Sequence, residues 1–473
     1  MMGITWKRAL IAGVSVVALS AGLQVQAAPL EEAVQALVRD NPTILEAAAN
    51  RRALDFELEQ ARGLYRPQID LTTRVGPEWS TLGPDAADEP RLVHVSSLTL
   101  RQLLFDGFAT ESEIERQAAR VDAAAERVRE RSEFIALDLV EAYLDIMRHQ
   151  ELVALAEDNV RVHAVTLGDV RERVEGGQTG VGDVQQAEGR YADAKATRIE
   201  ARQDLDEAIN RYLRLAGREE QNMSRPEFKW AVLPVTQDEA VDRALKLNPT
   251  LFLADADIDV AKANIAAAKS NNYPTVTGVL GANHNYQVDR KDQTYNAYTA
   301  QLRMDWNLYR GLIDRHNVYE QVERLSETRA ARLRLEREVI EEVRQSWNAM
   351  TKARERAEVL NDQVVANGQV VSTYRQEFQV GERDLLDVLD SENELFTSRV
   401  RAVTADYTAL FGAYRLLAST GELLSYLGVS IRGEATGNRR DNYGVTPEYR
   451  WETDYQAGDY FRDGRLPMEK PEE

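Results

Sequence analysis

Cysteine is absent from this chain of 473 residues. Without thiols the chain has no disulfide framework, no thiolate nucleophile, no cysteine ligand for a metal and no cysteine to carry a lipid. Histidine is scarce, and no two histidines stand at the spacing of metal ligands; they are His94, His149, His163, His284 and His316. The composition therefore predicts neither a metal site nor a cofactor.

Basic residues are fewer than acidic residues. The chain carries 58 basic and 78 acidic residues, which gives a formal net charge of −20. Proteins that bind nucleic acids neutralise phosphates with clustered lysine and arginine. The charge balance therefore argues against a nucleic acid partner, and by itself it is typical of an ordinary hydrated surface.

Sequence patterns of catalysis are missing as well. The chain has no GxSxG, HExxH or Walker pattern. The glycine-rich segment at residues 176–182 resembles a phosphate-binding loop, but it lacks the Lys-Ser/Thr ending and no strand is expected before it. We interpret this segment as a turn, and we expect the protein not to be an enzyme.

Only the N-terminus contains a long apolar run. Lys7 and Arg8 precede a largely apolar stretch at residues 9–23, and Val25-Gln26-Ala27 follows it. A charged region, a hydrophobic region and a small-residue cleavage site together predict a secretory signal peptide at residues 1–27. No later stretch resembles a transmembrane helix, so any part that spans lipid has to consist of strands.

What the chain does contain is an internal repeat. Asn41-Pro42-Thr43 returns as Asn248-Pro249-Thr250, at an offset of 207 residues. Further pairs share an offset of 204: Leu104 and Leu308, Gly107 and Gly311, Tyr143 and Trp347, Gly217 and Gly421. We predict a tandem duplication with repeats at residues 28–225 and 226–431, followed by a polar, loosely ordered tail at residues 432–473.

Both repeats have the same predicted order of elements. We expect a helix at 30–63 and 236–271, two strands, a long helix at 108–175 and 312–379, and a return helix at 184–216 and 385–420. Apolar seams such as Leu137, Val140 and Leu144 are typical of coiled coils. A helix of about 68 residues extends roughly 100 Å, which is too long for a compact domain.

The strands carry a two-faced pattern. Apolar and polar side chains alternate over residues 298–308, about the length of a tilted transmembrane strand. The alternation predicts that Leu302, Met304 and Trp306 face lipid, while Arg303 faces water. Trp306 lies near one end of the strand, where aromatic side chains favour the membrane interface.

The number of strands limits how they can lie in a membrane. The strand pairs flank polar loops at residues 83–85 and 289–292. Four strands leave two open edges, which lipid does not tolerate. Either the sheet lies outside a membrane or several chains share one barrel, with eight strands for a dimer and twelve for a trimer. The strand count does not choose between these arrangements.

The segment Phe378–Phe396 has a turn at its start and helix signals after it. Asp387 and Asp390 stand three residues apart, so they share one face of the expected helix. The pattern occurs 204 residues earlier, where Asp183 corresponds to Asp387, and we expect the two turns to meet in space. If three chains meet there, six carboxylates form a ring of the kind that selects cations. The alternative is a hydrated acidic helix face.

Together these features resemble the TolC-type outer-membrane channel family, also called outer membrane efflux proteins. The resemblance covers residues 30–430 and rests on the duplicated units, the Asn-Pro-Thr segments, Leu-Leu-Phe-Asp-Gly at 103–107 and Val-Gly-Glu-Arg-Asp-Leu-Leu-Asp-Val-Leu-Asp at 380–390. It implies a mainly α-helical fold with transmembrane β-strands. In such a homotrimer each chain gives four strands to one porin-like, 12-stranded β-barrel in outer-membrane lipid, and a long α-helical barrel extends into the periplasm.

The resemblance also implies partners. A periplasmic adaptor, or membrane fusion protein, docks on the helical end of such channels. An inner-membrane ABC or proton-driven transporter supplies the energy, so the channel itself is passive and uses no cofactor.

The resemblance assigns roles to residues near the turn. Asp387 and Asp390 match the acidic rings of the periplasmic gate, and Arg383 and Asp183 match partners in the tie that holds the gate shut. Phe378 stands where an aromatic residue with a hydroxyl serves in the family. The tie therefore has one potential hydrogen bond fewer in this chain.

The segment from Asp387 to Phe396 looks most like family members that serve type I protein secretion, including exporters of large repeat-built adhesins. The missing lipidation cysteine fits the same branch. We therefore predict an outer-membrane export duct for protein substrates. Two alternatives stay open: the outer-membrane component of a multidrug or small-molecule efflux pump, and, from another class, a soluble periplasmic coiled-coil scaffold.

Overall fold

The computed structural model of the protein describes residues 30–79, 90–218, 223–288 and 293–437. The first half contains α1 (Leu30–Asp40), α2 (Pro42–Gly63), β1 (Gln68–Glu78), β2 (Arg91–Phe105), α3 (Ala109–Glu175) and α4 (Val181–Ala216). The second half contains η1 (Trp230–Val232), α5 (Gln237–Leu247), α6 (Pro249–Ser270), β3 (Thr275–Tyr286), β4 (Thr294–Asp305), α7 (Ile313–Val380), α8 (Leu385–Thr420), α9 (Leu423–Tyr426) and η2 (Gly433–Ala435). The predicted signal peptide and the loops at 83–85 and 289–292 lie outside the described residues.

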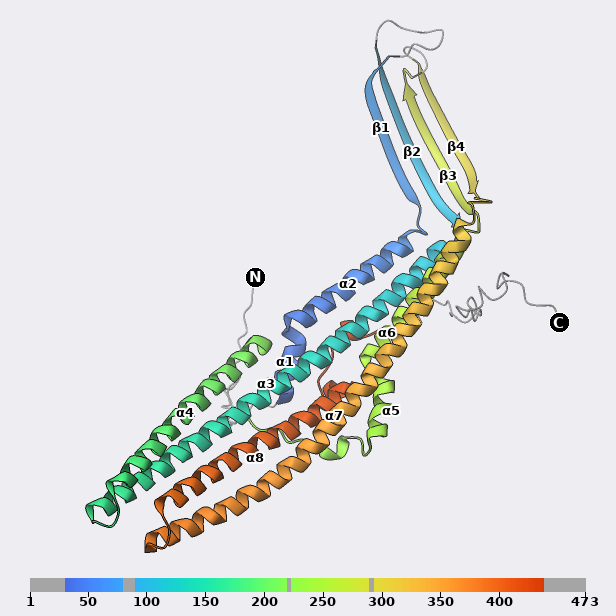
Figure 1. The fold of residues 1–473 in the computed structure, drawn as a ribbon. Helices are drawn as coiled ribbons and strands as arrows, with labels where there is room; N and C mark the ends of the chain where they lie inside the picture. Colours follow the sequence, from blue (N-terminus) through green and yellow to red (C-terminus); the bar gives the residue numbers. More distant parts are fainter. Residues whose placement is uncertain (1–29, 80–89, 219–222, 289–292, 438–473) are drawn as a thin grey trace, which may run out of the picture.

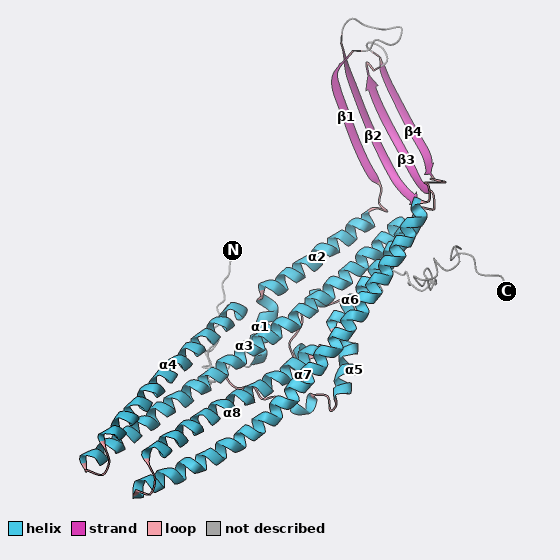
Figure 2. Cartoon of the chain, viewed as in Figure 1, coloured by secondary structure: helices cyan, strands magenta, loops and turns pink. Residues whose placement is uncertain are grey.

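The same order of elements occurs twice along the chain, two helices, two strands and two long helices. The four strands form a sheet at one end of the molecule, and α3 and α7 run from its base to the opposite end, from which α4 and α8 return part of the way (Figure 1). Helix and strand are thus separated in space (Figure 2). The boundaries of the two repeats, 28–225 and 226–431, stay a prediction.

The sheet is antiparallel throughout, in the order β1-β2-β3-β4. Its register aligns one apolar row across all strands, Ile69, Leu100, Leu280 and Ala300. Successive side chains on a strand point to opposite faces, so Arg303 lies on the face opposite this row. The sheet is therefore two-faced, as the alternation predicts.

The predicted limits of the last strand are wrong. Strand β4 begins at Thr294 and ends at Asp305, because Thr275, its partner there, is the first residue of β3. Trp306 therefore lies just outside the strand, where its indole Nε1 donates a hydrogen bond to the Asn272 carbonyl (3.2 Å). Leu302 and Met304 lie on one face of β4, as expected.

The predicted single helices at 30–63 and 236–271 are each two helices. Proline restricts the preceding residue to an extended conformation, and Asn41 (φ −66°, ψ 128°) and Asn248 (φ −68°, ψ 121°) adopt it. Each asparagine then caps the next helix, since its side chain accepts a hydrogen bond from the backbone N–H two residues on (2.9 Å in both cases).

The same asparagines tie the short helices to the long ones. Asn248 Nδ2 donates to the Ser419 carbonyl near the end of α8 (2.9 Å), and Asn41 Nδ2 donates to the Leu215 carbonyl near the end of α4 (3.2 Å). Gly217 and Gly421 directly follow α4 and α8, and both have the left-handed conformation expected of C-cap glycines.

The main hydrophobic core lies where the short helices meet the middle of the long ones (Figure 1). The predicted seams contribute to it: Val140 and Leu144 from α3 and Val343 and Met350 from α7 are buried there. No helix in the described ranges is apolar enough along its length to cross a membrane.

The tail is ordered where it begins. Ala435 in η2 is buried against Ala48 and Val128, and Arg432 donates to the Arg39 carbonyl (2.9 Å). The expectation of a loosely ordered tail from residue 432 onward is therefore wrong for its first residues, because one small apolar side chain finds a buried site between α2 and α3. Residues 438–473 lie outside the described part of the chain.

Replacing Asn248 with Ala removes both the cap of α6 and the buried bond to α8. We expect the free energy of unfolding to fall by about 2 kcal/mol. The midpoint of denaturant unfolding of the detergent-solubilised protein measures this change. Asn361→Ala on the exposed face of α7 is the control and should not lower the midpoint, because alanine favours the helix. Equal midpoints for the two variants would contradict the role of Asn248.

Candidate functional site at the helical tip

Two helical hairpins, α3–α4 and α7–α8, form the end of the molecule far from the sheet (Figure 1). The first hairpin turns at residues 176–180 and the second at residues 381–384. Gly177 and Gly381 have positive φ angles of 71° and 83°, which glycine adopts without strain. The glycine-rich segment 176–182 thus contains a turn, as interpreted from the sequence. We call the part of the two hairpins nearest these turns the tip.

An apolar contact joins the two hairpins at the tip. Val170 of α3 packs with Leu385 and Leu389 of α8, and all three side chains are buried. Val184 and Phe378 pack against this cluster. The structure therefore brings the two turn regions together, as the repeated pattern predicts.

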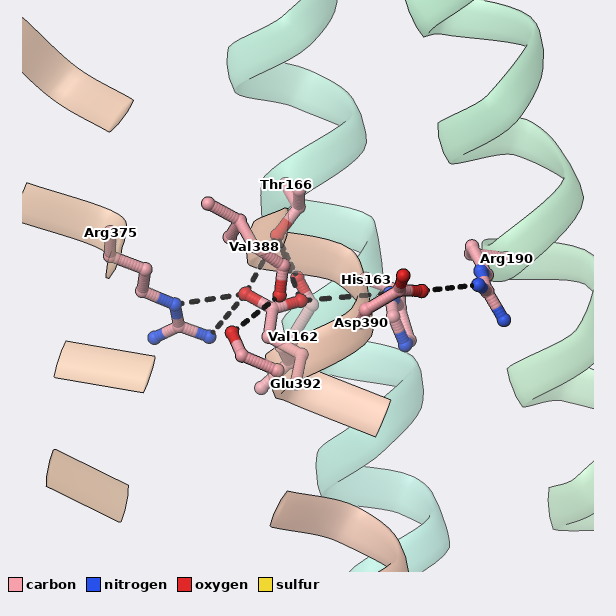
Figure 3. Close-up of polar contacts among 9 residues, drawn as sticks. Val162, His163, Thr166, Arg190, Arg375, Val388, Asp390 and Glu392 are labelled. Atoms are coloured by element: carbon pink, nitrogen blue, oxygen red, sulfur yellow. Dashed lines mark hydrogen bonds and ion pairs between the residues drawn. The ribbon is translucent and has the colours of Figure 1, made fainter. Parts of the chain in front are cut away.

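The two candidate gate carboxylates lie in the first turns of α8. Their side chains are about half exposed, 46% for Asp387 and 57% for Asp390. Arg383 Nη1 donates to Asp387 (3.3 Å), and Arg190 Nη2 of α4 donates to Asp390 (2.7 Å; Figure 3). Each carboxylate is thus paired with an arginine of its own chain.

The gate-tie candidates have separate partners within one chain. Arg383 forms its shorter ion pair with Glu377 (2.8 Å), and its guanidinium lies 4.1 Å from the centre of the Tyr374 ring. The Asp183 carboxylate accepts a hydrogen bond from the Thr179 hydroxyl. Within the described part of the chain no hydrogen bond or ion pair joins Arg383 to Asp183, so their role in a tie stays a prediction.

Phe378 takes part in a contact between the hairpins that needs no hydroxyl. The Arg173 guanidinium of α3 lies 4.3 Å from the centre of the Phe378 ring, an arrangement that favours cation–π attraction. Arg173 Nη2 also donates to the Gln379 carbonyl (3.1 Å). An arginine of the first hairpin therefore engages the position where the family can use an aromatic hydroxyl.

Sequence reasoning missed a buried polar cluster at the tip. Glu392 of α8 accepts a hydrogen bond from Arg375 Nε of α7 (2.9 Å) and lies near Thr166 and His163 of α3 (Figure 3). We call these four residues the Glu392 cluster. Burial lowers the pKa of His163, and the Glu392 carboxylate acts against that shift.

A sequence signal for this cluster did exist. Glu392 follows Leu385 and Leu389 at spacings of seven and three residues, which places it on the same buried helix face. A carboxylate at such a position needs a partner, because burying an unpaired charge is unfavourable. The partner helices were not identifiable from spacing alone.

A cavity of about 880 Å³ lies beside the Glu392 cluster, between α3, α7 and α8. Charged side chains of both signs line it, including Arg161, Asp169, Arg375 and Glu392. Among the residues that the structure describes, no group of three or more His, Asp or Glu side chains is arranged to hold a metal ion. Because most of the lining side chains come from α3, α7 and α8, the arrangement is suited to contacts between these helices.

Comparison with known proteins identifies the family to which this sequence is similar. Residues 33–218 and 240–422 match the family described as outer membrane efflux protein. The chain is 25% identical to the outer membrane efflux protein BepC of Brucella suis, over 86% of this chain and 89% of BepC. It is 24% identical to the proteases secretion protein PrtF of Dickeya chrysanthemi, over 70% of this chain and 73% of PrtF.

The outer membrane channel CmeC of Campylobacter jejuni has a similar structure, with a TM-score of 0.73 at 11% sequence identity, over 83% of this chain and 86% of that one. The TolC-type resemblance and the predicted fold class are confirmed, and the alternative of a soluble periplasmic scaffold is wrong. The family and its structural neighbours are channel proteins rather than enzymes. The chain therefore belongs to the outer membrane efflux protein family, located in the outer membrane with a helical part that extends into the periplasm.

Proposed function

We propose that three copies of this chain form an export duct for type I secretion, which passes protein substrates from an inner-membrane ATPase and a periplasmic adaptor to the exterior. The observation that carries the proposal is the segment from Asp387 to Phe396, which supplies both the acidic pair and the buried Glu392 at the tip. The similarity to PrtF, named as a protease secretion protein, supports the same assignment.

The sheet supports an assembly of several chains. Strands β1 and β4 are its two edges, so among the residues that the structure describes a single copy leaves backbone groups along both strands without sheet partners. Lipid offers no hydrogen bonds to such groups, and the edges of neighbouring copies offer them. Three copies give a closed barrel of about twelve strands, within the size range of outer-membrane barrels.

The proposed mechanism is passive. The duct performs no hydrolysis and forms no covalent intermediate, and the inner-membrane transporter supplies the energy. In a threefold assembly Asp387 and Asp390 line the narrow end, where their charge selects against anions. The hairpins then have to move apart for a protein substrate to pass.

A second function has its own support. BepC, named as an efflux protein, matches this chain over most of its length, which favours a duct for small molecules. The two functions need the same barrel and the same tip, and they differ in the transporter that docks and in the cargo.

The test is the protein content of the culture medium and cell surface, with and without the gene for this chain. Type I secretion predicts that a specific secreted protein disappears from the mutant and returns on complementation. If the secreted set is unchanged while sensitivity to dyes and detergents rises, the duct serves small-molecule efflux and the secretion proposal is wrong.

The acidic pair has a separate electrical test. In planar bilayers under a KCl gradient, Asp387→Asn and Asp390→Asn should each shift the reversal potential toward weaker cation preference, because each removes a negative charge per chain. Arg190→Gln should shift it the opposite way, because it frees Asp390. Arg171→Gln is the control, since Arg171 pairs with Glu188 rather than with either aspartate. Unchanged potentials in both aspartate variants would contradict the proposed ring.

The proposed lipid face of β4 has a test of its own. Leu302→Lys should lower the yield of assembled trimer in outer-membrane extracts, because a cation on the lipid side costs about 2–4 kcal/mol near the bilayer midplane. Gln301→Lys, on the opposite face of the same strand, is the matched control and should assemble normally. Equal trimer yields for both variants would refute this assignment of the faces.

A further inference from the structure

Glu392 is a buried charge at a place where the protein is proposed to open. Its side chain is only 2% exposed, although it stands on α8 just two residues after the half-exposed Asp390. A buried carboxylate is retained only where other groups compensate for its lost hydration. The groups that surround Glu392 therefore indicate the role of its buried carboxylate.

Within its own hairpin, Glu392 is in direct hydrogen-bonding contact with Arg375. Arg375 of α7 donates from Nε to Glu392 Oε1 at 2.9 Å, and its Nη2 lies 2.8 Å from the same oxygen. These are the distances of a strong, charge-assisted hydrogen bond. Because α7 and α8 belong to one hairpin, the pair can move with that hairpin without breaking.

The contacts of Glu392 with the other hairpin are longer. The Thr166 hydroxyl of α3 lies 3.4 Å from Glu392 Oε1, and it also donates to the Val162 carbonyl (3.1 Å). His163 Nδ1 lies 3.7 Å from Glu392 Oε2, and this buried atom has no hydrogen-bond partner among the described residues. In Figure 3 the arginine and the histidine approach the carboxylate from opposite sides.

The difference in contact length indicates which contacts of Glu392 persist and which break when the hairpins separate. The shorter contacts lie within the α7–α8 hairpin, and the longer ones cross to α3. The apolar contact of Val170 with Leu385 and Leu389 crosses at the same level and in the same direction. Separation of α3 from α8 would break the contacts of Glu392 with Thr166 and His163 and leave Arg375 as its partner.

We propose that Glu392 is a positioning residue that clasps the two hairpins: it holds α3 against α8 at the tip and releases α3, still paired with Arg375, when the hairpins separate. The inference rests on the proposed function in one respect, that separation of the hairpins opens the duct. It adds the residue that resists this separation. Asp387 and Asp390 stand on the same helix end, so the clasp also sets their position.

The test uses the full-length trimer and two measurements. Since the chain has no cysteine, Glu175→Cys and Glu382→Cys place unique spin labels on exposed sites of the two hairpins. One labelled chain per trimer then reports the distance between hairpins by pulsed electron paramagnetic resonance. Single-channel conductance in planar bilayers reports the opening of the duct.

Glu392→Gln should lengthen and broaden the distance distribution and raise the conductance, because it removes the charge that Arg375 and α3 surround. Thr166→Val removes only the hydroxyl on α3, and it should cause a smaller change in the same direction. Glu394→Gln is the matched control: the residue type and helix are the same, but the side chain is exposed. It should change neither measurement.

Wild-type distances in both Glu392→Gln and Thr166→Val would overturn the clasp. If Glu392→Gln fails to assemble, the distance in Thr166→Val decides by itself. Longer distances at unchanged conductance would support the clasp while contradicting the proposal that hairpin separation opens the duct. The two failures are therefore distinguishable.

Discussion

The edge strands β1 and β4 impose the constraint on which the rest of the architecture depends. Backbone N–H and C=O groups along an open edge need partners, and the hydrocarbon layer of a membrane has none to offer. In the described part of the chain the sheet has four strands and does not close on itself. An outer-membrane protein of this kind has to complete its barrel with further copies. Because the helices continue from the strands of each chain, they share the symmetry of the barrel.

The long helices connect the sheet to the tip at the far end of the molecule. Helices α3 and α7 run continuously for 67 and 68 residues, so an arrangement set at the membrane is carried to the far end of the molecule. The core that anchors them lies midway, where α1, α5 and α9 pack against the long helices. Between that core and the turns, fewer buried side chains hold the hairpins together. The tip is therefore the part of the helical region best suited to move.

Charge at the tip is compensated rather than simply negative. Arg190 neutralises Asp390, and Arg383 is shared between Asp387 and Glu377. The exposed pairs contribute little stability individually, since water competes for both partners. Glu392 differs because it is buried, and its contacts reach across the boundary between hairpins. We therefore propose that the exposed carboxylates influence the electrical potential of the tip, and that the buried Glu392 governs how the helices that carry them are held.

Local rules in the sequence determined much of this protein. The period-2 alternation, the apolar seams and the C-cap glycines identified strands, long helices and their ends, because these signals depend only on neighbouring residues. The Asn-Pro-Thr segments were visible as a repeat, yet the break that they impose on each first helix was missed. The same rules that mark proline as a helix breaker apply there, so Pro42 and Pro249 carried enough information for a correct prediction.

Tertiary structure decided what depends on partners distant along the chain. The bond from Asn248 to Ser419, the pairing of Arg190 with Asp390 and the approach of His163 and Thr166 to Glu392 join residues about 170 to 230 positions apart. Periodicity shows which face of a helix is buried, but not which helix covers it. Asp387 and Asp390 were therefore found from spacing, whereas Glu392, whose importance lies in what surrounds it, became recognisable only when α3, α7 and α8 were packed together.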